Sequence, residues 1–494
     1  MKDWVIKYRN YILFIITIII SCILYWNYLI GHFAAETYAI SLGYKNYAIN
    51  AYLADGRFFS FLFIILADKL EIPILTLISI STLSAIIIAT VAILYLKNYI
   101  IQLVKLTKKQ ELIVWGICYC IIFNFMMVEI MYFPECCIMV SSILCYIISA
   151  KYLIQRKYVR SLFILIIGIF CYQGTIGFFI VCAFVFSVFK NGKIGKAVFI
   201  DICKMTLMGI IVASINLVFI KLIALFLHLV QNKVFSLNFN IIKQNIYLNI
   251  KSVYPVLQNS CGLFPKNLLL IYIEIVIGFT LLISYKEKED KVMKLLALIL
   301  VTIVSSFIMF IIQRGSIFTG RVHFCIGSLI GISLLYIYCM TNIKDKKIWR
   351  NIFLVILLSY AIVNCANTAK LTTEHKIANK LEKEECIRIE NLIYQYENES
   401  GIQINKVVLI LIQNQSERGY FEQTKRRTII TYNNIRHYYG YSGVLQYYLK
   451  RDFEYIGLNK ESENIYRKYI IENNLEYGNI VCIEDTLYCP QYHM

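Results

Sequence analysis

Acidic and basic residues stand close together at a few points of a chain that is otherwise poor in charge. The stretch AYLADGRFFS places Asp55 and Arg57 on either side of Gly56, just before an apolar run. Glu36 lies upstream in AAETYAI, and Glu135 lies downstream in MYFPECC. A carboxylate can take a proton from a hydroxyl group, and a guanidinium can hold a phosphate through paired hydrogen bonds. These residue types predict a site that activates a hydroxyl group and stabilises a phosphate as a leaving group.

More polar residues stand at the ends of other apolar runs and could join that site. They are Tyr172 and Gln173 in CYQGT, Lys266 after NSCGLFP, and Arg314, Arg321 and His323 in IQRGSIFTGRVHF. Taken singly, each has a simpler explanation. A lone Arg or Lys near a span end can snorkel to the interface, a Tyr can belong to the aromatic belt, and a His can be a packed core residue. Their convergence on one side of the membrane favours a functional role.

The composition predicts a membrane protein with many spans. Of the 494 residues, 59% are hydrophobic and 16% are charged, whereas soluble domains carry about 25% charged residues. Apolar runs of about 20 residues, the length that crosses a bilayer core, recur along the chain. The net charge of +18 comes from Lys and Arg clustered in short loops, which is the positive-inside pattern. We therefore expect membrane lipids and not nucleic acid as partners.

Loop charges predict the topology of a multi-pass protein of the cell membrane. The basic N-terminal tail is placed in the cytoplasm, and the basic loops that follow are placed on the same side. The expected spans are eleven: 11–31, 73–96, 111–130, 136–154, 161–171, 175–189, 199–229, 267–285, 292–312, 322–341 and 351–367. An odd number puts the C-terminal region outside. The predicted organisation is a transmembrane domain over 1–367 and an extracytoplasmic domain over 368–494.

The outer segments carry their own local signals. The apolar run 58–67 is too short to span and is expected to lie along the interface. Residues 36–57 have the spacing of an amphipathic helix resting on the membrane surface. In the C-terminal region, KVVLILIQN and GNIVCIED are strand-like, which predicts a small α/β domain. Cys482 and Cys489 could pair there, and the sequence alone does not decide it.

The position of the predicted site restricts its substrate. A phosphate at the outer surface, carried there by lipid, points to a polyprenyl-phosphate sugar. The chain has no evident P-loop or dinucleotide-binding glycine motif, so a soluble nucleotide donor is not favoured. No Cys or His cluster has metal-site spacing. The residue pattern requires no cofactor, and it does not decide whether a divalent cation takes part in the reaction.

The layout resembles the GT-C superfamily of integral-membrane glycosyltransferases over roughly residues 1–370. The matching features are an acid soon after the first span (AAETYAI), an interfacial loop helix (DGRFFSFLF) and a second acid in the next outer loop (YFPE). Within that superfamily the chain is most similar to the GtrII-type O-antigen glucosyltransferases of bacteria and phages, because CYQGTIGFF resembles their Tyr-Gln hairpin.

The resemblance implies transfer of a hexose, often glucose, from undecaprenyl phosphate to a cell-surface polysaccharide. It implies Glu36 as the general base, Glu135 as a second acid in the cleft, and Arg57 near the lipid phosphate. Many relatives carry an acidic pair after the first span, whereas here Ala and Thr flank Glu36, so Asp55 is the alternative base. The Ile-, Lys- and Asn-rich composition suggests a low-GC bacterium and hence a Gram-positive wall polymer as acceptor.

Two other functions stay open at this point. A membrane polysaccharide polymerase would also use outer Arg residues. For that function we would expect a large central outer loop that carries these Arg residues, whereas the outer loop 230–266 has only scattered Lys residues. A transporter or lipid-glycan flippase predicts broken helices with polar residues at mid-membrane and internal repeats, and neither is clear in the sequence.

Overall fold

A computed structural model describes most of the chain. The described residues are 8–228, 238–258, 266–268, 270–275, 278, 300–301, 304–305, 321–340, 347–412, 434–436, 440–457 and 459–492. They fall into two compact units. Unit 1 contains Met1–Gly31 and Ala48–Thr372, and unit 2 contains His32–Tyr47 and Thr373–Met494. A short N-terminal segment thus belongs with the C-terminal residues, and the predicted single boundary at 367/368 stays a prediction.

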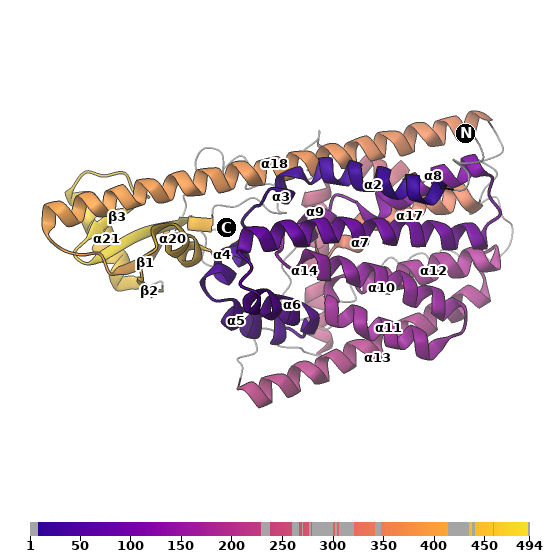
Figure 1. The fold of residues 1–494 in the computed structure, drawn as a ribbon, viewed down its shortest axis with the longest axis horizontal. Helices are drawn as coiled ribbons and strands as arrows, with labels where there is room; N and C mark the ends of the chain where they lie inside the picture. Colours follow the sequence, from indigo (N-terminus) through magenta and orange to yellow (C-terminus); the bar gives the residue numbers. More distant parts are fainter. Residues whose placement is uncertain are drawn as a thin grey trace. The chain divides into compact units, whose positions relative to one another are not determined.

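Unit 1 is built from helices, drawn from indigo to orange in Figure 1. They are α2 (Arg9–Leu24), α3 (Trp26–Leu29), the π-helix η1 (Ala48–Leu53), α6 (Phe58–Lys69), α7 (Ile74–Leu103), α8 (Lys108–Ile122), α9 (Met127–Met131), α10 (Cys136–Ile154), α11 (Tyr158–Cys171), the 3₁₀ turn η2 (Gln173–Thr175), α12 (Gly177–Asn191), α13 (Lys196–Leu227), α14 (Phe239–Gln258), α17 (Phe324–Met340) and the first part of α18 (Lys347–Ser400).

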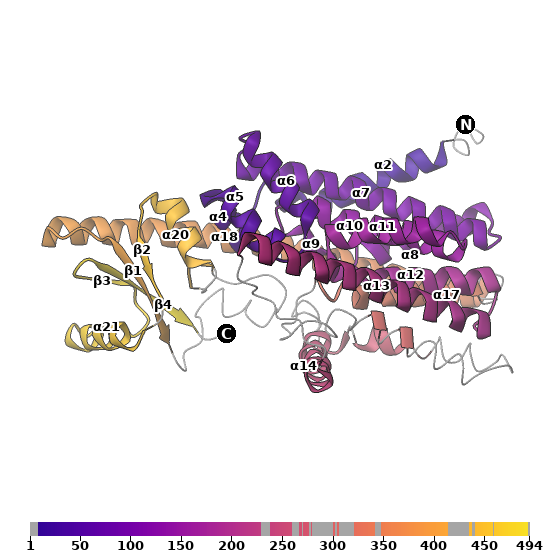
Figure 2. The same ribbon diagram turned by 90° about the horizontal axis from the view of Figure 1, so that it is seen from below.

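Helix α10 lies at the centre of this bundle and packs against α7, α11 and α12 (Figures 1 and 2). The face that α7 buries includes Ser81, Ala85 and Ala89, spaced four residues apart. Small residues at this spacing let two helix backbones approach closely, which is how helices associate in a membrane. The Ser81 hydroxyl lies 3.3 Å from Cys136 Sγ at the start of α10. This contact places the first turn of α10 beside Ser81 of α7.

Five helices in the described part of the chain are long and apolar enough to cross a membrane. They are Ile74–Leu103, Cys136–Ile154, Gln173–Asn191, Lys196–Leu227 and Lys347–Ser400. These are the helices of a helical membrane protein, as the composition predicts. The count of eleven spans and their orientation stay predictions, because most of 267–285 and 292–312 lies outside the described residues.

The predicted span 111–130 is not one continuous helix, because the chain breaks at Asn124, and its crossing of the membrane stays a prediction. Helix α8 ends at Ile122, and α9 starts only at Met127. The Asn124 carboxamide accepts from the backbone N–H of Met126 at 3.0 Å and donates to the Ile121 carbonyl at 3.0 Å. Such local side-chain hydrogen bonds compete with the helical ladder and end it.

The predicted single amphipathic helix over 36–57 is also wrong. The segment forms α4 (Ala35–Leu42), α5 (Tyr44–Tyr47) and η1. Gly43, a poor helix former, is extended there with φ −179° and ψ 84°. By contrast, the apolar run 58–67, which is expected to lie along the interface, forms the 12-residue helix α6. This helix is about 18 Å long. That is shorter than the roughly 30 Å hydrocarbon core, and its place at the interface stays a prediction.

Unit 2 combines α4, α5 and the polar part of α18 with a four-stranded sheet. The remaining elements are β1 (Lys406–Ile412), η5 (Asn434–Arg436), α20 (Tyr441–Leu449), β2 (Glu454–Ile456), α21 (Lys460–Glu472), β3 (Val481–Ile483) and β4 (Thr486–Tyr492). The strand order is β2-β1-β4-β3, with β1 parallel to both neighbours and β3 antiparallel to β4. The two strand-like stretches of the sequence contain β1 and β3.

The core of the sheet is apolar and aromatic. Val408 and Ile410 of β1 pack with Tyr466 and Ile470 of α21, and Tyr488 of β4 joins them. Residues 407–410 of the parallel strand β1 are buried, as strands covered by helices usually are. Cys482 and Cys489 lie on adjacent strands as free thiols, and the β3–β4 register pairs Cys482 with Leu487 instead.

Candidate functional site

The loop before α6 brings Arg57 between two carboxylates of unit 1. Asp55 lies one residue away across Gly56, and its Oδ2 is 3.6 Å from the Arg57 guanidinium. Glu135 caps the start of α10, and its Oε1 is 3.8 Å from the same group. Glu135 is fully buried, and the Arg57 side chain is only 14% exposed. A buried carboxylate is stable when a charge and a hydrogen bond compensate it, and Arg57 supplies the charge.

Two tyrosines complete this cluster. The Tyr52 hydroxyl, in η1, donates a 2.8 Å hydrogen bond to Glu135 Oε2. The Arg57 guanidinium lies 5.2 Å from the ring centre of Tyr172, within cation–π distance. Burial raises the pKa of the Tyr172 phenol, against the opposing charges of Arg321 and Arg57. The phenol therefore stays protonated at neutral pH and can donate a hydrogen bond.

Polar side chains from two other elements hold the loop in place. Gln173 Nε2 donates to the Asp55 carbonyl and, at 3.3 Å, to Asn216 Oδ1. Asn216, in the middle of α13, donates in turn to the Gly56 carbonyl at 3.1 Å. These bonds satisfy loop carbonyls that would otherwise be buried without partners. The Tyr172–Gln173 turn and α13 thus fix the backbone that carries Asp55 and Arg57.

A second ion pair lies in the same unit. Arg321, just before α17, is 3.3 Å from Glu129 Oε1 of α9. Its guanidinium also covers the Phe133 ring at 4.3 Å. Arg321 and Arg57 both act electrostatically on Tyr172. Unit 1 therefore gathers two guanidiniums around one phenol, each balanced by a carboxylate that is itself almost fully buried.

The Nε–H of Arg57 is a further feature of this cluster. The Arg57 Nε–H is buried and has no hydrogen-bond acceptor among the residues that the structure describes. Buried polar groups are rarely left unpaired, and a guanidinium donor of this kind suits a phosphate oxygen. The two ion pairs of Arg57 are also longer than the 2.7–2.9 Å of tight charge-assisted bonds.

Glu36 belongs to unit 2, in the first turn of α4. Helix α4 starts with a bond from the Ala34 N–H to the Thr37 hydroxyl, at 3.0 Å. A carboxylate in a first turn is favoured by the helix dipole. One of its oxygens, Oε2, is buried and has no hydrogen-bond partner within the described residues.

The other predicted site residues fall in different places. His323 is fully buried at the turn before α17, where its carbonyl accepts from Ile326. Lys266 is exposed, and the cluster contacts described above do not include it. Arg314 lies outside the described residues. The structure therefore brings Asp55, Arg57, Glu135, Tyr172, Gln173 and Arg321 together around the loop before α6.

Sequence reasoning missed three residues of this cluster. Tyr52 was read as part of an amphipathic surface helix, and Phe133 was not singled out. Asn216 carried a usable signal, because a carboxamide within a long apolar run is costly and is generally kept for a reason. The pairing of Glu129 with Arg321 could not be seen from their spacing in the sequence.

Among the described residues, no group of three or more His, Cys, Asp or Glu side chains could hold a metal ion. Comparisons of the chain with models of protein families, with curated proteins and with solved structures found no match.

Proposed function

We propose that this protein is a membrane glycosyltransferase that moves a hexose, with glucose as the first candidate, from a polyprenyl-phosphate donor to a cell-surface polysaccharide on the outer side of the membrane. The observation that carries the proposal is the Arg57 cluster. A largely buried guanidinium, whose Nε–H has no acceptor among the described residues, lies between two carboxylates and close to a protonated phenol. Such a cluster fits a phosphate that must leave with its negative charge.

The proposed reaction has one bond-forming and one bond-breaking event. An acceptor hydroxyl oxygen attacks the anomeric carbon of the donor sugar, and the bond from that carbon to the phosphate oxygen breaks. The electron pair stays with the polyprenyl phosphate, whose charge Arg57 and Arg321 neutralise. The hydroxyl proton passes to a carboxylate acting as general base.

Glu36 is our first candidate for the base, because its Oε2 has no hydrogen-bond partner in the described part of the chain. Asp55 is the second candidate. Its carboxylate lies 3.6 Å from the Arg57 guanidinium and so already has an ion-pair partner. Glu135 is less suited, since it is fully buried and already accepts from Tyr52.

Matched amide variants test the proposal. Membranes that contain Glu36→Gln, Asp55→Asn or the parent protein are supplied with a radiolabelled polyprenyl-phosphate hexose and the surface polysaccharide. Glu36→Gln should lower the transfer rate about 10²–10⁴-fold, the usual contribution of a general base, while donor binding persists. Loss of transfer in Asp55→Asn alone would reassign the base. Parental rates in both variants would contradict the transferase and favour a flippase, which carries lipid-linked sugar without forming a bond.

A further inference from the structure

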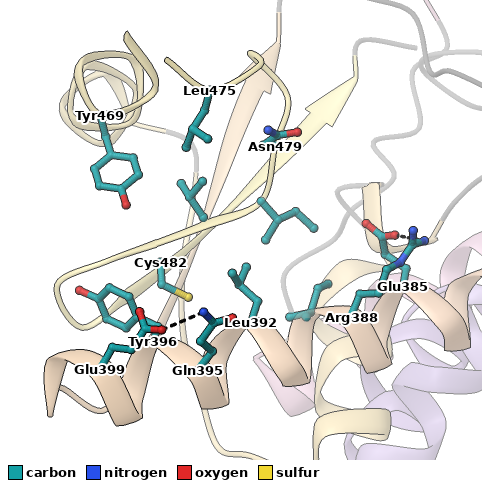
Figure 3. Close-up of a pocket in the computed structure, with 13 residues that line it drawn as sticks. Glu385, Arg388, Leu392, Gln395, Tyr396, Glu399, Tyr469, Leu475, Asn479 and Cys482 are labelled. Atoms are coloured by element: carbon teal, nitrogen blue, oxygen red, sulfur yellow. Dashed lines mark hydrogen bonds and ion pairs between the residues drawn. The ribbon is translucent and has the colours of Figure 1, made fainter. Parts of the chain in front are cut away.

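Unit 2 contains a cavity of about 490 Å³ far along the chain from the Arg57 cluster. It lies between the polar end of α18, helix α21 and the segment that leads into β3 (Figure 3). The volume falls within the roughly 300–1,000 Å³ range of small-molecule sites. The side chains that matter below are Glu385, Arg388, Gln395, Tyr396, Glu399 and Tyr469.

The charges of this cavity argue against an anionic ligand. Its wall has one guanidinium and two carboxylates. The guanidinium, Arg388, is already paired with Glu385 at 2.5 Å. The second carboxylate, Glu399, accepts from Gln395 Nε2 at 2.8 Å. The two carboxylates of this wall outnumber its guanidinium, which Glu385 already holds at 2.5 Å. The ion pairs of Arg57, by contrast, are 3.6 and 3.8 Å long.

Two tyrosines give the cavity its aromatic character. In Figure 3, Tyr469 comes from α21 and Tyr396 from α18, so the two rings belong to different walls. Both are partly buried. The face of an aromatic ring is negative and attracts the weakly positive C–H groups of a flat molecule. Amide and carboxylate side chains at the edge of the same cavity accept from and donate to hydroxyl groups.

We propose that this cavity binds a pyranose unit of a neutral glycan. A pyranose ring presents a face of C–H groups and a rim of hydroxyl groups, and the cavity offers aromatic faces together with Gln395, Glu399 and Asn479. Purely apolar ligands are disfavoured by that polar rim, and anions by the charge balance. If the proposed transferase function is correct, this glycan is the acceptor polysaccharide, and the cavity retains the polymer between transfers.

Binding by the full-length protein in lipid nanodiscs, without any sugar donor, tests the cavity. The probes are maltotriose, cellotriose, triacetylchitotriose and neutral oligosaccharides released from the surface of the producing cell, with inorganic phosphate as the charged comparison. Saturation-transfer NMR should detect at least one oligosaccharide and not phosphate. Tyr396→Leu and Tyr469→Leu keep apolar packing but remove the ring, and each should weaken binding about tenfold, the loss expected for an aromatic anchor.

Tyr394→Leu is the matched control, because Tyr394 lies on the same helix, is 65% exposed and does not line the cavity. It should bind the oligosaccharide as the parent does. Gln395→Ala, at an exposed position, should also weaken binding and guards against a folding defect in the tyrosine variants. Absence of binding to every oligosaccharide, or equal affinity in all variants, would overturn the proposal.

The outcome is separable from that of the Glu36 experiment. Binding that depends on Tyr396, in a protein without transferase activity, would keep the cavity as a glycan site and remove only its role as acceptor site. Transfer that proceeds with parental affinity for the polysaccharide in Tyr396→Leu would keep the transferase and remove this cavity from it.

Discussion

Arg57 is the residue on which the proposed donor site depends, and its two roles can be separated. It compensates the buried Glu135, and it offers an Nε–H donor that no described residue accepts from. Arg57→Lys keeps a positive charge but loses the planar fork. We expect the apparent KM for the polyprenyl-phosphate sugar to rise at least about tenfold, with a thermal midpoint close to that of the parent.

Arg57→Ala should behave differently, because it removes the guanidinium that lies 3.8 Å from the buried Glu135. Removing one partner of a buried ion pair typically costs about 3–5 kcal/mol, so the thermal midpoint should fall as well as the donor affinity. Lys69→Ala, at an exposed position at the end of α6, is the control and should change neither quantity. Equal donor KM values in the parent and Arg57→Lys would remove Arg57 from the donor site.

Glu382 gives unit 2 a pH-dependent stability. It lies beyond the apolar part of α18 and is fully buried. Its oxygens accept from the Tyr38 hydroxyl at 3.2 Å, from Asn379 at 3.2 Å, and from the backbone and side chain of Asn434 at 2.7 and 2.8 Å. Burial raises the pKa of Glu382 from 4.5 to about 7, although these hydrogen bonds oppose the shift.

The raised pKa of Glu382 determines how the stability of unit 2 changes with pH. Between pH 4.5 and about 7 the folded protein holds a proton on Glu382 that the unfolded chain has released, so stability falls as pH rises through this range. Glu382→Gln cannot titrate. The difference in thermal midpoint between the parent and Glu382→Gln should therefore favour the parent at pH 5 and shrink or reverse at pH 8. A difference that is constant with pH would show that Glu382 does not titrate in this range.

At the scale of elements, the turn into α6 requires a glycine. Gly56 has φ +75°, and an added Cβ would lie 2.7 Å from Ile220 Cγ1 and 3.0 Å from Asn216 Nδ2 of α13. Gly192 has nearly the same φ, +71°, but open space around it. Left-handed backbone costs an alanine about 1–2 kcal/mol at either position. The clash with α13 adds about 1–3 kcal/mol at Gly56 only.

Gly56→Ala should therefore lower the thermal midpoint more than Gly192→Ala does. It should also lower the transfer rate, because it displaces the loop that carries Asp55 and Arg57. Gly192→Ala should leave the transfer rate unchanged. If the two variants lose stability and activity to the same extent, the packing of this turn against α13 is not what positions Arg57.

The elements also show what hydropathy can and cannot predict. Apolar length located α7, α10 and α13 well, because burying an apolar helix depends on composition. The break after α8 could not be predicted from hydropathy. It depends on Asn124, whose side chain bonds to the backbone of Ile121 and Met126 and to Ser328 Oγ of α17, the last at 3.1 Å. The continuation of α18 to Ser400 was missed too, because a change from apolar to polar residues looks like a helix end.

The candidate site was predictable in its residue types but not in its pairings. Charge in an apolar chain singled out Asp55, Arg57 and Glu135, and the structure brings all three together. Tyr52 and Asn216 escaped notice because their roles depend on contacts across 83 and 160 residues. Contacts at that separation follow from helix packing, which local patterns do not contain.

At the scale of the whole molecule, the orientation of the chain in the membrane decides whether a surface polysaccharide can reach the proposed site. Helix α18 is continuous for 54 residues, and its apolar stretch lies in its first part while acids and bases crowd the rest. A helix of this length measures about 81 Å, far more than the roughly 30 Å hydrocarbon core. Its polar part must therefore project from the membrane on one side.

The loop charges predict that this side is the outer one. Basic residues cluster at Lys97–Lys109 and Lys190–Lys196, and such clusters stay in the cytoplasm. Reporter fusions after residues 100, 195 and 370 should therefore read inside, inside and outside. An inside reading at 370, with the other two as expected, would make the number of spans before α18 leaves the membrane even. It would also place Glu382, the sheet and the glycan cavity in the cytoplasm, where a surface polysaccharide cannot reach them.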